Sequence, residues 1–376
     1  MNANEDKNDT DKHLKQMGWT PHFQSQLDEI SQLKTSPARV IGVSRKSFQV
    51  SDGKDERSAT AAGRLSYHSD SLYPVIGDWV LMKGTVISKV LERRNVLSRQ
   101  AAGTRGRQSA GAPKEQLIAA NLDTVFIVCG LDRDFNLSRI ERYLILVYNC
   151  GLSPVIILTK ADLQKDPDSF VSEVEPIASG VPIYAVSLYD NQGFVPLEKY
   201  LSLGQTAILV GSSGAGKSTL LNQLYGENVQ ATGSVSDSEG KGKHTTTSRD
   251  LIMMPQGGMV IDNPGIREIS FTNDDGGIDE AFPDIEKLAE KCRFSDCSHM
   301  HEPGCRVLQA VADGELAKNR LQSFRKIQRE LSYSSERQSK SAAKVEKERW
   351  KNVALKVKAM KKKSDKKADK KIHIKN

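Results

Sequence analysis

The feature that most constrains the fold of this chain is a glycine-rich segment that follows an apolar run of strand length. The segment has the sequence GSSGAGKS from Gly211 to Ser218, directly after the run 207–210. It satisfies the GxxxxGKS pattern in the strand-to-helix context that this pattern requires. Its glycines let backbone amides turn toward an anion, and the following helix adds positive potential at its N-terminus. We therefore expect a nucleotide phosphate site formed by Gly211, Ser212, Ser213, Gly214, Ala215, Gly216, Lys217, Ser218 and Thr219, with the Lys217 ammonium on the outer phosphates and Ser218 as a ligand of Mg²⁺.

The chain around this loop alternates between apolar runs of strand length and helical segments. The runs are 125–128, 155–158, 183–186, 207–210 and 259–261, and the helical segments include 137–148 and 217–224. Continuous apolar strands separated by helices predict a mostly parallel sheet covered on both faces. Because such sheets bind ligands beyond the carboxyl ends of their strands, we expect the functional residues there.

A second motif ends the run 155–158 and is similar to the guanine-specificity motif NKxD, with Thr in place of Asn. It consists of Thr159, Lys160, Ala161 and Asp162. A carboxylate at Asp162 accepts hydrogen bonds from the N1 proton and the N2 amine of guanine, whereas adenine has no N1 proton and leaves the carboxylate unpaired. We expect Lys160 to pack along the base. Ser187, at the end of the run 183–186, lies where a second loop supports the base.

A third motif, Asp262-Asn263-Pro264-Gly265, closes the run 259–261 and fits a DxxG element. We expect Asp262 to hold Mg²⁺ through water and the Gly265 amide to sense the γ-phosphate. Taken alone, DxPG is a common turn, and the phosphate loop upstream favours the functional interpretation.

The order of the three motifs is their most diagnostic property. Ordinary GTPases carry the phosphate loop first and the base motif last, whereas here Thr159 to Asp162 and Ser187 precede Gly211 to Ser218, and Asp262 to Gly265 follow. The sequence therefore predicts a circularly permuted GTPase domain. We expect the nucleotide state to reach the next domain through Ile266 to Ile269.

A cysteine-rich segment follows, with the spacing Cys292-x4-Cys297-x-His299-x5-Cys305. Three thiolates and one imidazole suit a closed tetrahedral zinc site, which is structural because no position stays open. On spacing alone, His301 competes with His299 for the fourth position. Cys129 and Cys150 lie in apolar runs and are interpreted as core residues.

Short alternating segments before the sheet predict a small β-barrel of the OB or SH3-like kind. They are 39–43, 47–50, 59–65, 75–82 and 85–91. The predicted organisation is a multidomain chain. It comprises a flexible leader 1–35, an OB-fold barrel 36–100, a basic linker 101–117, a permuted α/β GTPase domain 118–270, a mainly helical zinc-binding domain 271–335 and a Lys-rich tail 336–376.

The net charge of +7 is concentrated in the tail. From Lys340 to Asn376 there are 15 Lys and Arg residues against 4 Asp and Glu, so this segment carries +11 and the rest of the chain −4. A basic tail either stays solvated or displaces counterions from a nucleic-acid backbone, and the arginines of the linker are likewise either part of a tether or face RNA. No window has the roughly 18 apolar residues of a membrane span, and the polar N-terminus lacks a secretion signal. We expect a cytoplasmic protein without a membrane partner.

With this order of motifs, the chain closely resembles the RsgA (YjeQ) family of small ribosomal subunit biogenesis GTPases. The resemblance extends over about residues 38 to 330. It includes Gly77 to Val80, Gln116, Ile118 to Asp123, Gly242 to Thr247 and Gly265 to Glu268. The family places its zinc-binding histidine where this chain has His299. The resemblance implies an OB-fold, permuted GTPase and zinc-domain protein that binds the small ribosomal subunit and its rRNA late in assembly. It also implies hydrolysis of GTP to GDP and phosphate that the subunit stimulates. We expect a monomer.

The catalytic group is not given by the motifs. Ile266 stands where many GTPases carry a water-orienting Gln, and its apolar side chain cannot position water. The group must come from His244 in the segment 242–247, or from the ribosome. We expect Thr246, or a neighbouring threonine, to close on Mg²⁺ and the γ-phosphate.

Three functions remain in competition at this point. The first is an rRNA-dependent GTPase that acts as an assembly checkpoint. The second is a nucleotide-gated RNA-binding module with negligible turnover, which Ile266 suggests. The third is an ATP-dependent nucleic-acid enzyme that shares only the phosphate loop, and the argument from Asp162 disfavours it.

Overall fold

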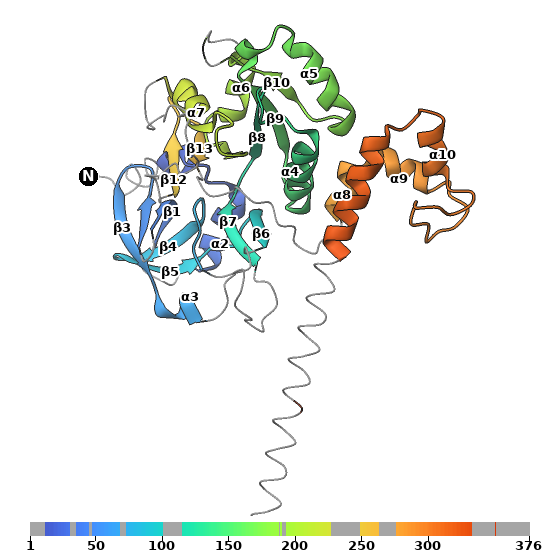
Figure 1. The fold of residues 1–376 in the computed structure, drawn as a ribbon. Helices are drawn as coiled ribbons and strands as arrows, with labels where there is room; N and C mark the ends of the chain where they lie inside the picture. Colours follow the sequence, from blue (N-terminus) through green and yellow to red (C-terminus); the bar gives the residue numbers. More distant parts are fainter. Residues whose placement is uncertain are drawn as a thin grey trace, which may run out of the picture.

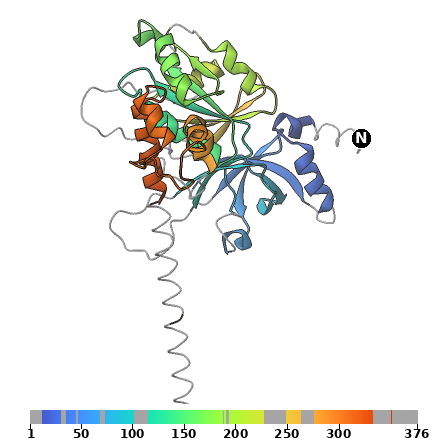
Figure 2. The ribbon, with the colours of Figure 1, turned by 90° about the vertical axis from the view of Figure 1, so that its right-hand side faces the viewer.

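The computed structural model describes residues 12–30, 35–44, 47–67, 73–100, 115–187, 189, 193–226, 249–262, 276–332 and 350. Three parts follow one another along this chain, and Figure 1 shows the barrel at one end of the central sheet and the C-terminal helices beside helix α4, which covers that sheet. Figure 2, turned by 90° from that view, also shows the N-terminal strands and the C-terminal helices apart from each other.

The first part is the predicted five-stranded barrel, which is confirmed. Its strands are β1 Ser36–Val43, β2 Phe48–Ser51, β3 Glu56–Ala61, β4 Trp79–Lys83 and β5 Val86–Val90, with a short helix α3 Gly63–Tyr67. Pairing of β1 with both β2 and β4, together with the β2–β3, β3–β5 and β4–β5 pairs, closes the barrel. Alternating inward residues such as Val40, Val50, Val80 and Ile87 fill it.

The expectation of a flexible leader is wrong for residues 12–30. Residues 12–16 are helical and helix α2 spans Pro21–Glu29. Leu14, Met17 and Phe23 are buried in the main apolar core, and Trp19 packs edge-on against Trp79. These apolar residues lie in two short helices and in the turn between them, so no single periodic stretch in the sequence predicts them.

The second part is the parallel sheet, also as predicted. Its strands lie in the order β10 Ile183–Ala185, β9 Pro154–Thr159, β8 Thr124–Gly130, β11 Thr206–Val210 and β13 Met259–Asp262. The covering helices are α4 Leu137–Asn149, α5 Pro167–Val174, α6 Val195–Glu198 and α7 Lys217–Tyr225, with single 3₁₀ turns at Ala161–Leu163, Glu175–Ile177 and Lys199–Leu201. One apolar cluster contains residues of α4 and a second contains residues of α7, so both faces of the sheet are covered.

Strand β12, Arg249–Met253, was not predicted and joins the two parts. It runs antiparallel to β13 on one side and to β1 on the other, where Gly42 faces Asp250. The barrel and the parallel strands therefore form one continuous 11-stranded sheet. Strands β6 Val96–Gln100 and β7 Glu115–Ala120 form a separate two-stranded ribbon. The segment between them, 101–114, contains most of the predicted basic linker and lies outside the described residues.

The third part is helical, as expected. It contains α8 Gly276–Ala281, α9 Pro283–Ala289, α10 Arg306–Ala312 and a helix over residues 318–332. Between α10 and the helix over residues 318–332, the chain turns at Gly314 with a left-handed φ of 77°. Phe282, Ile285, Val307 and Phe324 form its core, and Ile145 of α4 completes that core from the neighbouring domain.

Candidate functional site

The glycine-rich loop lies between β11 and α7, at the carboxyl end of the strand. A side chain at Gly211 would place its Cβ 2.3 Å from the carbonyl oxygen of Val128, so only glycine fits at this position. Gly214 and Gly216 have φ values of 82° and 88°, in the left-handed region that glycine tolerates. Ser213 and Gly214 are exposed, so the loop presents backbone to solvent above the strand.

The polar side chains at the end of the loop and the start of α7 are Lys217, Ser218 and Thr219. The Lys217 ammonium donates to the carbonyl oxygens of Gly211 at 2.8 Å and Ser212 at 2.5 Å, which keeps it within the loop. Ser218 is half-buried in the first turn of α7, and Thr219 is exposed beside it. The loop thus gathers a cation, a hydroxyl and a helix N-terminus, the groups that a phosphate–Mg²⁺ pair requires.

The motif Thr159 to Asp162 is hydrogen-bonded to this loop. The buried Thr159 hydroxyl donates to the Ala215 carbonyl oxygen at 2.6 Å, and the Lys160 ammonium donates to the Gly214 carbonyl oxygen at 2.7 Å. Both contacts arise because β9 and β11 flank β8 in parallel and end at the same edge of the sheet. Two motifs that lie some 50 residues apart in the sequence therefore form one continuous surface.

Of the remaining sequence-predicted site residues, those that the structure describes lie at the same edge of the sheet. Ser187 donates to the exposed Asp162 carboxylate, with 3.2 Å between Oγ and Oδ1, and the Ala161 amide donates to the Val186 carbonyl oxygen. Asp262 is buried at the end of β13. Gly265, His244 and Thr246 lie outside the described residues, as does the segment Ile266 to Ile269.

Two acidic residues beside the loop are not predicted by any motif in the sequence. Asp132 and Asp134 lie between β8 and α4; Asp132 accepts from the Lys160 ammonium at 2.6 Å, and Asp134 accepts from the Ser212 hydroxyl and from Arg139. Burial alone would raise the pKa of Asp132, but the Lys160 ammonium and the Asp134 amide outweigh it and lower the pKa below its usual value. The only sequence signal was their position directly after the end of a buried strand.

The second candidate site is a cluster in the C-terminal part. Cys292, Cys297, His299 and Cys305 place their ligand atoms within 4.8 Å of one another. The Nδ1 atom of His299 lies 3.7 Å from the Cys292 sulfur and 3.4 Å from the Cys305 sulfur, and these two sulfurs are 3.9 Å apart. A tetrahedral zinc ion with ordinary bond lengths needs edges of about 3.6 Å between N and S and about 3.8 Å between two S atoms. The four side chains therefore fit zinc.

The surroundings of the cluster suit metal-binding side chains. Burial lowers the pKa of His299 and so favours the neutral imidazole that binds metals. Burial would raise the pKa of Cys292, but backbone amides of Val307 and Arg306 in the first turn of α10 outweigh it and lower that pKa. The Cys305 sulfur accepts from the Leu308 amide at 3.4 Å. His301, the competing imidazole, is exposed and is not a member of the cluster.

Comparison with known proteins agrees with this arrangement. A sequence model described as RsgA GTPase matches residues 90–272. The protein named small ribosomal subunit biogenesis GTPase RsgA 2 of Vibrio parahaemolyticus is 43% identical, over 86% of this chain and 87% of the relative. The chain belongs to the RsgA family. A member from Methanosarcina acetivorans is 44% identical over 77% of this chain and 78% of its own. Membership makes the chain a GTPase, and the order of its motifs makes the GTPase domain circularly permuted.

Solved structures support the same fold. The crystal structure of YjeQ from Thermotoga maritima superposes with a TM-score of 0.57 at 28% identity, covering 79% of this chain and 98% of that protein. YloQ, described as a circularly permuted GTPase, has a TM-score of 0.53 at 23% identity, which shows the fold alone.

A second sequence model, described as ABC transporter, matches residues 196–372. That segment contains the glycine-rich loop Gly211 to Ser218, a motif shared among nucleotide-binding families. The RsgA relatives instead cover most of the chain, and they decide the family. Within the described ranges, no helix has both the length and the apolarity needed to cross a bilayer.

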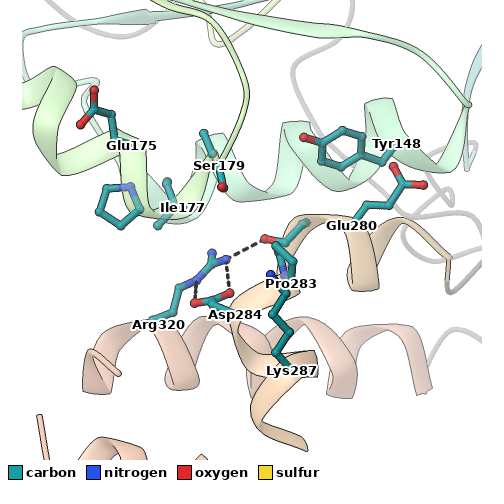
Figure 3. Close-up of a pocket in the computed structure, with 12 residues that line it drawn as sticks. Tyr148, Glu175, Ile177, Ser179, Glu280, Pro283, Asp284, Lys287 and Arg320 are labelled. Atoms are coloured by element: carbon teal, nitrogen blue, oxygen red, sulfur yellow. Dashed lines mark hydrogen bonds and ion pairs between the residues drawn. The ribbon is translucent and has the colours of Figure 1, made fainter. Parts of the chain in front are cut away.

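The RsgA-type GTPase domain contacts the C-terminal helices mainly through α4. The buried Arg320 guanidinium donates to the Glu141 carboxylate of α4 at 2.7 Å and to Asp284 of α9 at 2.9 Å. Arg142 pairs with Glu330, Ser138 with Ser323, and Asn149 with the Gly277 amide. A cavity of about 220 Å³ lies beside Arg320 between the two parts, with Tyr148, Glu175 and Ser179 on one wall and Pro283 and Lys287 on the other (Figure 3).

Proposed function

We propose that this chain is a GTP hydrolase that binds the small ribosomal subunit and its rRNA and acts as a late checkpoint of subunit assembly. In this proposal the subunit stimulates hydrolysis, and the protein acts as a cytoplasmic monomer. Support comes from the names of the relatives, which are small ribosomal subunit biogenesis GTPases, at 40% identity and above over most of the chain. The concentration of Lys and Arg in the tail is consistent with an RNA partner.

The observation that carries the proposal is the direct bonding of the base motif to the phosphate loop through Thr159–Ala215 and Lys160–Gly214. A single nucleotide can therefore contact both surfaces, with its base on one and its phosphates on the other. We assign guanine recognition to Asp162, with Lys160 packed along the base and Ser187 supporting the Asp162 carboxylate. Thr159 and Ala161 position this motif.

For the phosphates, we assign the backbone from Gly211 to Gly216 and the Lys217 ammonium. Ser218 and Asp262 are the proposed Mg²⁺ partners, and Thr219 lies next to them on α7. Gly265, Thr246 and His244 are proposed to complete the site around the γ-phosphate, with His244 or a ribosomal group orienting the water.

We assign one structural zinc ion to Cys292, Cys297, His299 and Cys305, whose mutual distances fit a closed tetrahedral shell. Bound zinc links the segment before α10 to the first turn of that helix, because Cys305 precedes Arg306 directly. It has no open position and takes no part in hydrolysis.

The experiment measures phosphate release from GTP and from ATP, with and without purified small ribosomal subunits. Strong stimulation confined to GTP is the expected result. GTP binding without stimulated release would favour the nucleotide-gated module with negligible turnover. Equal use of ATP would contradict the assignment of Asp162.

Two variants sharpen this measurement. In Asp162→Asn the side-chain amide can donate to a C2 carbonyl, so we expect preference to move from GTP toward XTP, whose base carries oxygen in place of the N2 amine. His244→Ala with unchanged subunit-stimulated turnover would remove His244 from the catalytic role and leave the ribosomal group.

A further inference from the structure

Lys160 is fixed at three points along its length. Its backbone has a φ of 60°, in the left-handed region that a lysine adopts rarely. Its stem lies over Gly130, where an added Cβ would come within 3.4 Å of Lys160 Cδ and Cε. Its ammonium lies between the Asp132 carboxylate at 2.6 Å and the Gly214 carbonyl oxygen at 2.7 Å. A side chain held in this way has little freedom left to lose when a ligand packs against it.

Asp132 is itself held in place by its own loop. Its Oδ1 atom accepts from the Asp134 amide at 2.9 Å, while its Oδ2 atom accepts from Lys160. The Phe135 amide donates to the Asp132 carbonyl oxygen at 3.1 Å, and the Leu131 amide donates to the Thr159 carbonyl oxygen at 2.8 Å. The carboxylate is therefore presented to the lysine from a rigid turn between β8 and the start of α4.

We propose that Asp132 is a positioning residue for the guanine nucleotide, because it fixes Lys160 in the conformation that packs along the base. This inference rests on the proposed role of Thr159 to Asp162 in guanine binding. Without the carboxylate, the long lysine side chain gains rotamers in the free protein and must be ordered again on binding. The tie between Lys160 and the Gly214 carbonyl oxygen also loosens, so the base and phosphate surfaces lose one of their two direct connections.

The test compares nucleotide binding and turnover in Asp132→Ala and Asp132→Asn. We expect Asp132→Ala to weaken GDP binding about tenfold, as for loss of one charge-assisted hydrogen bond. Asp132→Asn should recover part of the loss, because its amide oxygen still accepts from Lys160. The KM for GTP should rise by a similar factor while kcat falls by less than twofold, since the hydrogen bonds described for the Asp132 carboxylate go to Lys160 and the Asp134 amide and not to the phosphate loop. Asp168→Ala, which removes an exposed carboxylate of α5, is the matched control and should leave GDP binding unchanged.

A structural role for Asp132 is separated from the positioning role by a double-mutant cycle with Lys160→Met. If Asp132 acts through Lys160, Asp132→Ala should change GDP affinity by less than twofold once the ammonium is absent. A tenfold loss that persists in the Lys160→Met background would overturn the inference. So would a GDP affinity of Asp132→Ala within twofold of the wild type.

The wild-type protein and Asp162→Asn distinguish this inference from the function on which it rests. If wild-type protein binds GDP no better than ADP, the guanine assignment itself fails. If GDP is preferred and Asp162→Asn abolishes that preference, but Asp132→Ala binds GDP normally, only the positioning role fails.

Discussion

The GTPase domain has two neighbours, and the two are attached to it by different means. The barrel is joined through the backbone, because β12 pairs with β1 and extends one sheet across both domains. Arg39 reinforces this joint: buried in the barrel wall, it donates to the carbonyl oxygens of Met17, Gly77 and Asn121 and to the Thr206 hydroxyl.

The C-terminal helices are attached mainly through side chains of one helix, α4. Glu141 and Arg142 of α4 form ion pairs with Arg320 and Glu330, Ile145 supplies an apolar contact, and a cavity lies beside the Arg320 pair. Backbone pairing cannot be undone without unfolding a strand, whereas side-chain pairs can be exchanged for others. We therefore expect the barrel to move with the GTPase domain as one body, and the C-terminal helical part, residues 276–332, to be the part that changes its position.

The largest expected effect concerns the C-terminal helical part, residues 276–332, and the zinc ion proposed for it. Removing zinc with a chelator, or changing His299 to Ala, should cost residues 276–332 about 10 kcal/mol of folding free energy, by analogy with small zinc modules. Hydrogen exchange should show loss of protection there, with the barrel and GDP binding retained. His301→Ala, which removes the exposed neighbouring imidazole, is the control. Loss of protection throughout β1 to β5 would show that residues 276–332 do not unfold independently of the barrel.

An intermediate effect is expected where the barrel meets the sheet. Arg39→Met removes the buried hydrogen bonds to the carbonyl oxygens of Met17, Gly77 and Asn121 and to the Thr206 hydroxyl, so we expect a loss of about 3–5 kcal/mol in the free energy of unfolding. Burial lowers the pKa of Arg39 to about 10, so the wild-type side chain remains charged at neutral pH. Denaturant titration should show the barrel and the GTPase domain losing stability together. Lys89→Met, at an exposed position of β5, is the control; an equal effect there would refute the role of Arg39.

The smallest effect distinguishes the two ion pairs of α4. Arg142 and Glu330 are partly exposed, so reversing one charge in Arg142→Glu should cost about 1 kcal/mol or less in docking of residues 318–332. Adding Glu330→Arg to Arg142→Glu restores the pair with its two charges exchanged and should recover the lost docking free energy. Arg320→Ala should cost more, about 3 kcal/mol, because it leaves Glu141 buried without its partner. Protection of residues 318–332 against hydrogen exchange measures the loss in each variant. Equal losses in Arg142→Glu and Arg320→Ala would contradict the expectation that the Arg320 pair contributes more.

Local signals in the sequence predicted the parallel strands, the five barrel strands, the phosphate loop and the cysteine cluster. Each of these depends on residues close together in the chain: an apolar run, an alternation, or a spacing of cysteines. In the sequence, only the family resemblance distinguishes His299 from His301. In the structure, His299 has a left-handed φ of 56° and its Nδ1 atom lies 3.7 Å and 3.4 Å from the Cys292 and Cys305 sulfurs.

Other features depend on contacts between distant segments and could not be predicted locally. The partners of Arg39 come from residues 17, 77, 121 and 206, and no pattern in the sequence joins them. Leu14 and Phe23 look like isolated apolar residues in a polar leader until the barrel provides the core that buries them. In the sequence, Asp132 does not differ from any other polar residue that follows a strand. Only the fold shows that it lies beside Lys160.

The pairing of β12 with β1 has a consequence for how the chain is made. Gly42 is synthesised early and its partner Asp250 more than 200 residues later. At about 5–20 residues per second, the end of β1 waits on the order of 10–40 s for that partner while the protein is on the ribosome that translates it. During that interval the barrel has one short unpaired edge, the kind of edge that invites pairing with another chain. Translation speed between codons 43 and 249 is therefore expected to influence how much of the protein is recovered in soluble form.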